Sequence, residues 1–169
     1  QGARILAVDD NPANLKVLLE VLEAGGNTVL VATDGDRALS IAAQASPDLI
    51  LLDVTMPGLD GYEVCRRLQQ AEATRGVPVV FLTARNERQD IMAGFAAGGV
   101  DYVTKPFCED EVLVRVANHV RLRRLTADLE GANQALTHAN DELRREAEQR
   151  QALKGQLSMI SQREAERWG

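Results

Sequence analysis

The sequence predicts a doubly wound α/β fold, in which helices cover both faces of a five-stranded parallel sheet. Two observations predict it. Up to about residue 120, short and continuous apolar runs alternate with amphipathic stretches of helical period. Turn-forming residues bound each apolar run. Continuous apolar strands are typical of a sheet that is buried on both faces and joined by right-handed crossovers.

Each element follows from its local pattern. The short apolar runs predict strands at Arg4–Val8, Thr28–Ala32, Leu49–Leu52, Val79–Leu82 and Asp101–Val103. The amphipathic stretches predict helices at Pro12–Ala24, Gly35–Ala45, Gly61–Ala71 and Arg88–Ala97, and a fifth helix that begins near Glu109. Proline suits the first turn of the first helix, and Asp60 is expected to cap the third.

The composition restricts the class of protein. A length of 169 residues allows about one domain and an appendage. The formal charge of -6 argues against direct contact with nucleic acid, and no apolar run is long enough to cross a membrane. Cys65 and Cys108 are too few for a disulfide framework or a zinc cluster, so we expect a cytoplasmic protein.

The chain changes character near residue 120. Beyond it there is no proline, and residues 121–169 hold nine Lys and Arg against eight Asp and Glu. We therefore expect a globular domain over residues 1–120 and a helical extension over residues 121–169. Because the chain begins at Gln1 without a methionine and ends inside a helical pattern, it is expected to be a fragment.

Acidic residues follow the expected strands at one edge of the sheet. Asp9 and Asp10 follow the first strand, and Asp53 follows the third. Three converging carboxylates repel one another unless a cation lies among them, and hard oxygen ligands favour Mg²⁺. Individually, these residues could instead be a helix cap and a loop acid.

A hydroxyl and an ammonium group complete this edge. Thr83 follows the fourth strand and Lys105 follows the fifth. Taken singly, Thr83 could cap a helix and Lys105 could be a solvated surface charge. Together with a metal they could hold a phosphoryl group, with a carboxylate as the nucleophile. The pattern predicts chemistry through an aspartyl phosphate.

These motifs resemble the receiver domain of bacterial two-component response regulators. The resemblance rests on Asp9-Asp10, residues 53–61 (DVTMPGLDG), Thr83-Ala84 and residues 102–107 (YVTKPF), and it covers residues 3–122. It implies a flavodoxin-like sheet of order 2-1-3-4-5. It also implies phosphoryl transfer to this chain from a cognate histidine kinase or phosphotransfer protein, with at most slow self-dephosphorylation as enzymatic activity.

The resemblance also implies a role for each site residue. Asp53 would be the phosphoacceptor, and Asp10, Asp53 and the Thr55 backbone carbonyl would bind Mg²⁺, with Asp9 acting through water. Thr83 and Lys105 would bind the phosphoryl oxygens. Tyr102 would be a switch residue that turns inward with Thr83, or else an ordinary half-buried tyrosine. The Lys105–Pro106 peptide bond is expected to be cis.

Two other classes stay open from the residues alone. A phosphatase of the haloacid dehalogenase type also forms an aspartyl phosphate, although it requires a second Asp two residues after the nucleophile, where Thr55 stands. A dimerisation module that cannot be phosphorylated is the other alternative. His119 and His138 have no other His or Cys residue near them in the sequence to complete a metal site, and we expect both to be surface residues.

The extension has a heptad pattern. A 3-4 spacing joins Leu122, Leu125, Leu129, Ala132, Leu136, Ala139, Leu143, Glu146, Arg150, Leu153, Leu157 and Ile160. Such spacing predicts a coiled coil, most simply a parallel homodimer that transmits a signal to a missing C-terminal output domain. The polar positions Glu146 and Arg150 could fix the register, form a cross-chain ion pair, or mark a stutter. A solvated single helix or a disordered linker is the alternative.

Overall fold

The computed structural model describes residues 2–84 and 88–169, and it has the predicted alternation of strands and helices. The strands are β1 (Arg4–Val8), β2 (Thr28–Ala32), β3 (Leu49–Asp53), β4 (Val79–Thr83) and β5 (Asp101–Thr104). They form one sheet of order β2-β1-β3-β4-β5, in which every neighbouring pair is parallel. Both the fold class and the strand order are confirmed, and three strands are one residue longer than predicted.

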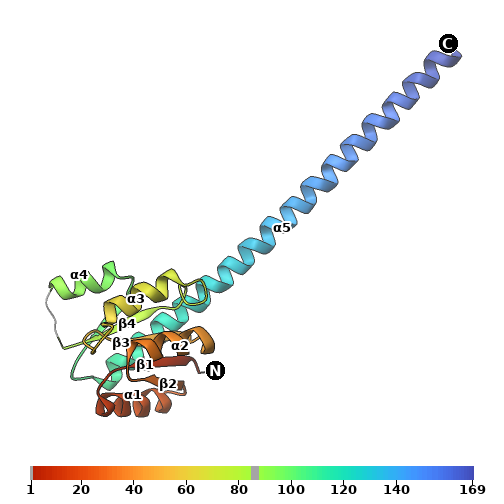
Figure 1. Cartoon of the computed structure of the whole chain (residues 1–169). Helices are drawn as coiled ribbons and strands as arrows, with labels where there is room; N and C mark the ends of the chain where they lie inside the picture. The colour runs from red at the N-terminus through yellow and green to blue at the C-terminus, as the bar shows by residue number, and fades with distance from the viewer. Residues whose placement is uncertain (1, 85–87) are drawn as a thin grey trace. The chain divides into compact units, whose positions relative to one another are not determined.

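Helices lie on both faces of this sheet (Figure 1). They are α1 (Pro12–Ala24), α2 (Gly35–Ala45), α3 (Gly61–Gln70), α4 (Arg88–Ala96) and α5 (Glu109–Trp168). Asp60 caps α3 as predicted, since its side chain accepts a hydrogen bond from the Glu63 amide. The cap of α1 is Asn11. The alternative that Asp9 or Asp10 caps this helix is therefore wrong.

Each face of the sheet packs against its own helices. On one face the core joins strand residues to α1 and the first turns of α5, where Val112, Val116 and Val120 are buried. On the other face the core joins strand residues to α2 and α3, including the fully buried Cys65. Because both faces are covered, β3 and β4 are buried along their whole length.

The chain divides into two compact units, residues 1–124 and 125–169. The first contains the sheet and the start of α5. The second is the remainder of α5, and each of its residues is exposed. Among the residues that the structure describes, no helix is long and apolar enough to span a membrane.

Candidate functional site

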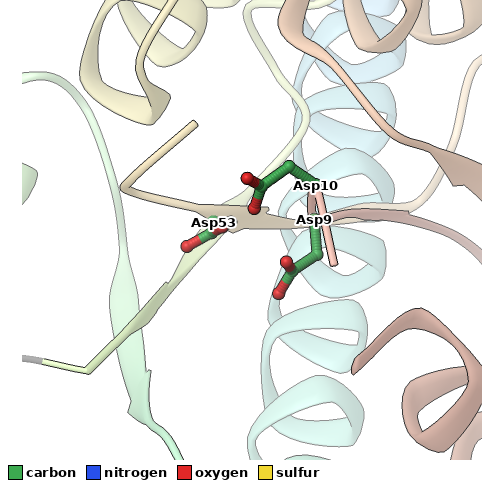
Figure 2. A group of neighbouring side chains, drawn as sticks. All are labelled: Asp9, Asp10 and Asp53. Carbon is green, nitrogen blue, oxygen red and sulfur yellow. The ribbon is translucent and has the colours of Figure 1, made fainter. Parts of the chain in front are cut away.

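Three carboxylates meet where β1 and β3 end (Figure 2). These strands are neighbours in the sheet, so their parallel direction brings Asp9, Asp10 and Asp53 to the same edge. Each offers an oxygen within 4.8 Å of the others. Asp9 is fully buried and Asp53 is 3% exposed, whereas Asp10 is exposed. The cluster is therefore buried on one side and open to solvent on the other.

Lys105 joins this cluster directly. Its Nζ lies 2.9 Å from Oδ2 of Asp9 and 3.1 Å from Oδ1 of Asp53. The side chain is only 20% exposed, so the alternative of a solvated surface charge is wrong. The Lys105 amide donates to the Thr83 carbonyl at 2.8 Å, and the Lys105–Pro106 peptide bond is cis, as the resemblance implied.

Burial and neighbouring charges shift the ionisation of both partners. Burial raises the pKa of Asp53 to about 6, and the Asp9 carboxylate adds to this rise against the opposing effect of Lys105. Burial would lower the pKa of Lys105, but hydrogen bonds to Asp9 and Asp53 outweigh it and the net shift is upward. The lysine is therefore a cation at neutral pH, and the site carries an excess of acidic groups around it.

Such an acidic group suits a divalent metal ion. Carboxylate oxygens are hard ligands, and the exposed Asp10 leaves an open side through which water or a substrate oxygen could complete the coordination. One ammonium group among three carboxylates leaves negative charge that a cation would offset. The donor set therefore fits Mg²⁺.

Thr83 and Tyr102 lie on neighbouring strands, where β4 pairs with β5. Thr83 is 7% exposed and Tyr102 is half-buried. Both line one cavity of about 10 Å³, together with Phe81 and α4 residues such as Gly94. Such a volume holds at most one water molecule. The two expected switch residues therefore share a small space beside the site.

The sequence did not single out Asn14, which holds Asp9 from the first turn of α1. Its Nδ2 donates to Oδ2 of Asp9 at 3.1 Å, the same oxygen that contacts Lys105. The Asn11 amide donates to the other oxygen of Asp9 at 2.9 Å. All these contacts orient a carboxylate that has no exposed surface. An amide side chain one turn after an acidic pair was the signal that could have identified it.

A second polar group ties β5 to α5. Arg115 Nη1 donates to both carboxylate oxygens of Asp101 at 2.8 Å, and Nε2 of His119 lies 2.9 Å from Oδ2. Burial would raise the pKa of Asp101, but these two partners lower it overall. His119 is half-buried, so its expected place on the surface is wrong. The guanidinium carbon of Arg115 also lies 6.0 Å from the Tyr102 ring centroid.

Comparison with known proteins identifies the globular part of the chain. Residues 5–117 match the family model of the response regulator receiver domain. The chain is 43% identical over 128 residues to the response regulator PleD of Caulobacter vibrioides, which covers 76% of this chain and 28% of PleD. It is 45% identical over 113 residues to the DNA-binding regulator RpaA of Synechocystis, covering 67% of this chain and 47% of RpaA. The chain thus spans about half or less of these relatives.

Solved structures agree with this identification. A response regulator from Chloroflexus aurantiacus has a TM-score of 0.69 at 36% identity, covering 72% of this chain and 99% of that one. The receiver domain of the sensor histidine kinase PA1611 from Pseudomonas aeruginosa, solved with magnesium in its active-site cleft, has a TM-score of 0.67 at 35% identity, covering 71% and 98%. The match favours a receiver over a dehalogenase-type phosphatase. The chain belongs to the response regulator receiver domain family of two-component systems.

Proposed function

We propose that Asp53 accepts a phosphoryl group from a phosphohistidine of a cognate histidine kinase or phosphotransfer protein. An oxygen of Asp53 attacks the phosphorus atom, the P–N bond breaks, and its electron pair stays with the departing imidazole. The product is an aspartyl phosphate. Its slow hydrolysis by water would return Asp53 to the carboxylate.

The carboxylates and one backbone carbonyl would hold the metal that this transfer needs. Asp10, Asp53 and the carbonyl of Thr55 are the proposed ligands of Mg²⁺, and Asp9 would act through a bound water. When bound, the ion offsets the negative charge of the phosphoryl oxygens. The exposure of Asp10 supports access from solvent to this edge of the sheet.

The observation that carries the proposal is the position of Lys105. Its ammonium group contacts both Asp9 and Asp53 and is held there by burial and by the backbone bond to Thr83. We propose that it moves from the Asp53 carboxylate to a phosphoryl oxygen, while the Thr83 hydroxyl donates to another. A preformed cation next to the nucleophile stabilises charge in the transition state with little reorganisation.

We further propose that Thr83 and Tyr102 report the phosphorylated state. Phosphorylation adds charge and strong acceptor oxygens beside Thr83. A shift of Thr83 toward them would open space in the cavity that it shares with Tyr102, whose ring would turn inward. The changed surface would be relayed through a dimeric coiled coil over residues 121–169 to an output domain.

The test is phosphorylation of the full chain by acetyl phosphate. We expect acid-labile phosphate on Asp53 only when Mg²⁺ is present, complete loss in Asp53→Asn, and no loss in the control Asp36→Asn, whose carboxyl group is exposed on α2. Phosphate on another residue, or none on the wild type, would contradict the proposal, the latter indicating a dimerisation module that cannot be phosphorylated. Steady turnover of a phosphomonoester would favour the phosphatase instead.

A further inference from the structure

The second unit of the chain has an apolar seam with two charged residues in its middle. Its leucines and isoleucine are more than half exposed, from 55% for Ile160 to 71% for Leu129. Glu146 and Arg150 lie on the same seam, because the steps from Leu143 to Glu146 and on to Arg150 keep the 3-4 spacing. The helix is continuous through both residues. A stutter in the repeat is therefore not needed to explain them.

We infer that this seam pairs with a second copy of the chain, in parallel and in register, and that Glu146 and Arg150 form ion pairs between the copies. The inference rests on the proposed dimeric stalk. In this arrangement the two Glu146 residues form one layer and the two Arg150 residues form the next, about 6 Å along the helix. The resulting group of four charges is neutral.

A parallel register shifted by one heptad leaves these charges without partners. Sliding one helix by a heptad places Glu146 opposite Leu153 or Ala139, and Arg150 opposite Leu157 or Leu143. A charge in an apolar layer is unfavourable because it loses water without gaining a counter-ion. The two charged layers therefore favour the in-register pairing over a shift by one heptad.

The residues that flank the seam form no ion pairs that would determine the register. In a parallel dimer the facing pairs between copies would be Arg121–Thr126, Asp128–Asn133, Ala135–Asn140, Glu142–Ala147, Gln149–Lys154 and Gln156–Ser161. None of them joins opposite charges, although such flanking pairs commonly determine register. Within the described part of the chain, Glu146 and Arg150 also have no ion-pair partner. Register must therefore come from the seam itself.

An antiparallel pair centred between the two charged residues would also place Glu146 against Arg150. It would, however, set Leu129 against Arg167 and Ala132 against Glu164. The parallel pair instead sets each apolar residue against its own copy. Apolar contact along the rest of the seam therefore favours the parallel arrangement.

The test mixes two charge-reversal variants of the full chain. Glu146→Arg leaves four arginines and Arg150→Glu leaves four glutamates in the middle of the seam, so we expect each variant alone to dimerise at least about tenfold more weakly than wild type. An equimolar mixture should form a heterodimer of near wild-type affinity, as should the homodimer of the double exchange Glu146→Arg/Arg150→Glu. Glu148→Arg, on the outward side, is the matched control. Sedimentation equilibrium gives each affinity.

A failure to fold cannot be rescued by mixing, so recovery in the mixture is diagnostic. If wild type is dimeric and both single variants dimerise equally well, the ion-pair inference is wrong while the stalk stands. If wild type is monomeric, the proposed stalk itself fails. Neither of these outcomes bears on phosphorylation of Asp53.

Disulfide cross-linking distinguishes a parallel dimer from an antiparallel one. In a Cys108→Ser background, where Cys65 is fully buried, Leu143→Cys should form a disulfide with its own copy in a parallel dimer. An antiparallel dimer would instead cross-link Leu143→Cys to Leu153→Cys, and this result would overturn the parallel arrangement.

Discussion

The two units of this chain treat apolar side chains in opposite ways. Residues 2–124 bury most of their aliphatic residues inside one chain, on both faces of the sheet. Residues 125–169 bury none, although leucine recurs through them at heptad spacing. Burial of a leucine contributes about 1.5–3 kcal/mol. The first unit is therefore stabilised by its own sequence, whereas the second needs a partner helix to gain this energy.

The units also treat charge differently. In the first, the Lys105 ammonium group contacts Asp9 and Asp53 within the same chain. In the second, the opposite charges of Glu146 and Arg150 lie on an exposed seam. A charge that becomes buried needs an opposite charge on the helix that covers it. The proposed phosphorylation site is therefore complete in a single chain, while the charged layers of the proposed stalk would be completed only by association.

The largest expected effect is the loss of dimerisation when charges are placed in the apolar seam of the second unit. Leu136→Lys combined with Leu143→Lys places four charges in the interface of a dimer, so we expect the dissociation constant to rise more than about 100-fold. The control Gln134→Lys/Gln151→Lys adds the same charge on the outward side and should leave the dimer intact. Phosphorylation of Asp53 should be unchanged in both variants. Sedimentation equilibrium and acetyl phosphate labelling measure the two properties, and loss of labelling together with dimerisation would contradict the separation of the units.

The next effect concerns the charge of Asp53 in the absence of metal. The pKa of this carboxyl is about 6 in the folded chain, against an ordinary value of 3.8. Between these pH values the folded state binds more protons than the unfolded state, so stability falls as pH rises from about 4 to 6. Asp53→Asn removes the carboxyl group and therefore this fall in the free energy of unfolding. In EDTA at pH 7.5 we expect it to raise the free energy of unfolding by up to about 3 kcal/mol.

The same variant supplies its own controls. Near pH 3.5 the gain should disappear, because Asp53 is then protonated in most molecules of both states. Mg²⁺ should raise the melting temperature of wild type more than that of Asp53→Asn. Calorimetry of the full chain at the two pH values checks both. An equal or lower stability of Asp53→Asn at pH 7.5 would show that the carboxylate is not under electrostatic strain.

Most of the fold could be predicted because its signals are local. The strands are continuous apolar runs, and caps such as Asp60 mark where helices start. The acidic edge was predictable for a different reason: parallel strands end on the same side, so residues far apart in sequence, such as Asp10 and Asp53, converge. These predictions needed no knowledge of side-chain conformation.

The remaining features depend on how side chains turn after folding. Asn14 lies in α1, and the amphipathic pattern of this helix does not predict the hydrogen bond from Asn14 to Asp9. The contacts of Asp101 with Arg115 and His119 require a particular rotation of α5 against β5, which composition and spacing do not fix. His119 was therefore placed on the surface by its sequence and beside Asp101 by the structure.

A third prediction concerns close packing in the first unit. A Cβ atom on Gly99 would collide with the Phe81 ring, and one on Gly94 would lie 3.1 Å from it. Phe81 is buried and packs against Tyr62 with 5.4 Å between ring centroids. We expect Gly99→Ala to lower the free energy of unfolding by about 1–3 kcal/mol. Gly76→Ala, which meets no atom within 4 Å, is the control for calorimetry. Equal stability of the two variants would contradict the packing argument.

A smaller effect is expected when the support of Asp9 is removed. Asn14→Ala deletes the amide that donates to this carboxylate, and a hydrogen bond to a charged group contributes about 1.5–3 kcal/mol when intact. Because Lys105 and the Asn11 amide still hold Asp9, we expect Mg²⁺ affinity to fall only about 3- to 10-fold. Titration calorimetry gives the affinity, and Val17→Ala, which alters an exposed residue of α1, is the control. Unchanged affinity would show that Asn14 has a structural role alone.

The smallest expected effect is that of Gly131→Ala, at a glycine that is not closely packed, unlike Gly99. Gly131 lies in the exposed second unit, where an added Cβ atom would meet no other atom within 4 Å, and it stands on the outward side of the heptad. Gly131→Ala should therefore stabilise the helix by about 0.5–1 kcal/mol per chain, since alanine restricts the unfolded backbone. Thermal unfolding followed by circular dichroism at a helix-sensitive wavelength measures it. A destabilised helix would mean that a partner packs closely at Gly131, and would place the contact on a different side of the helix from the leucine seam.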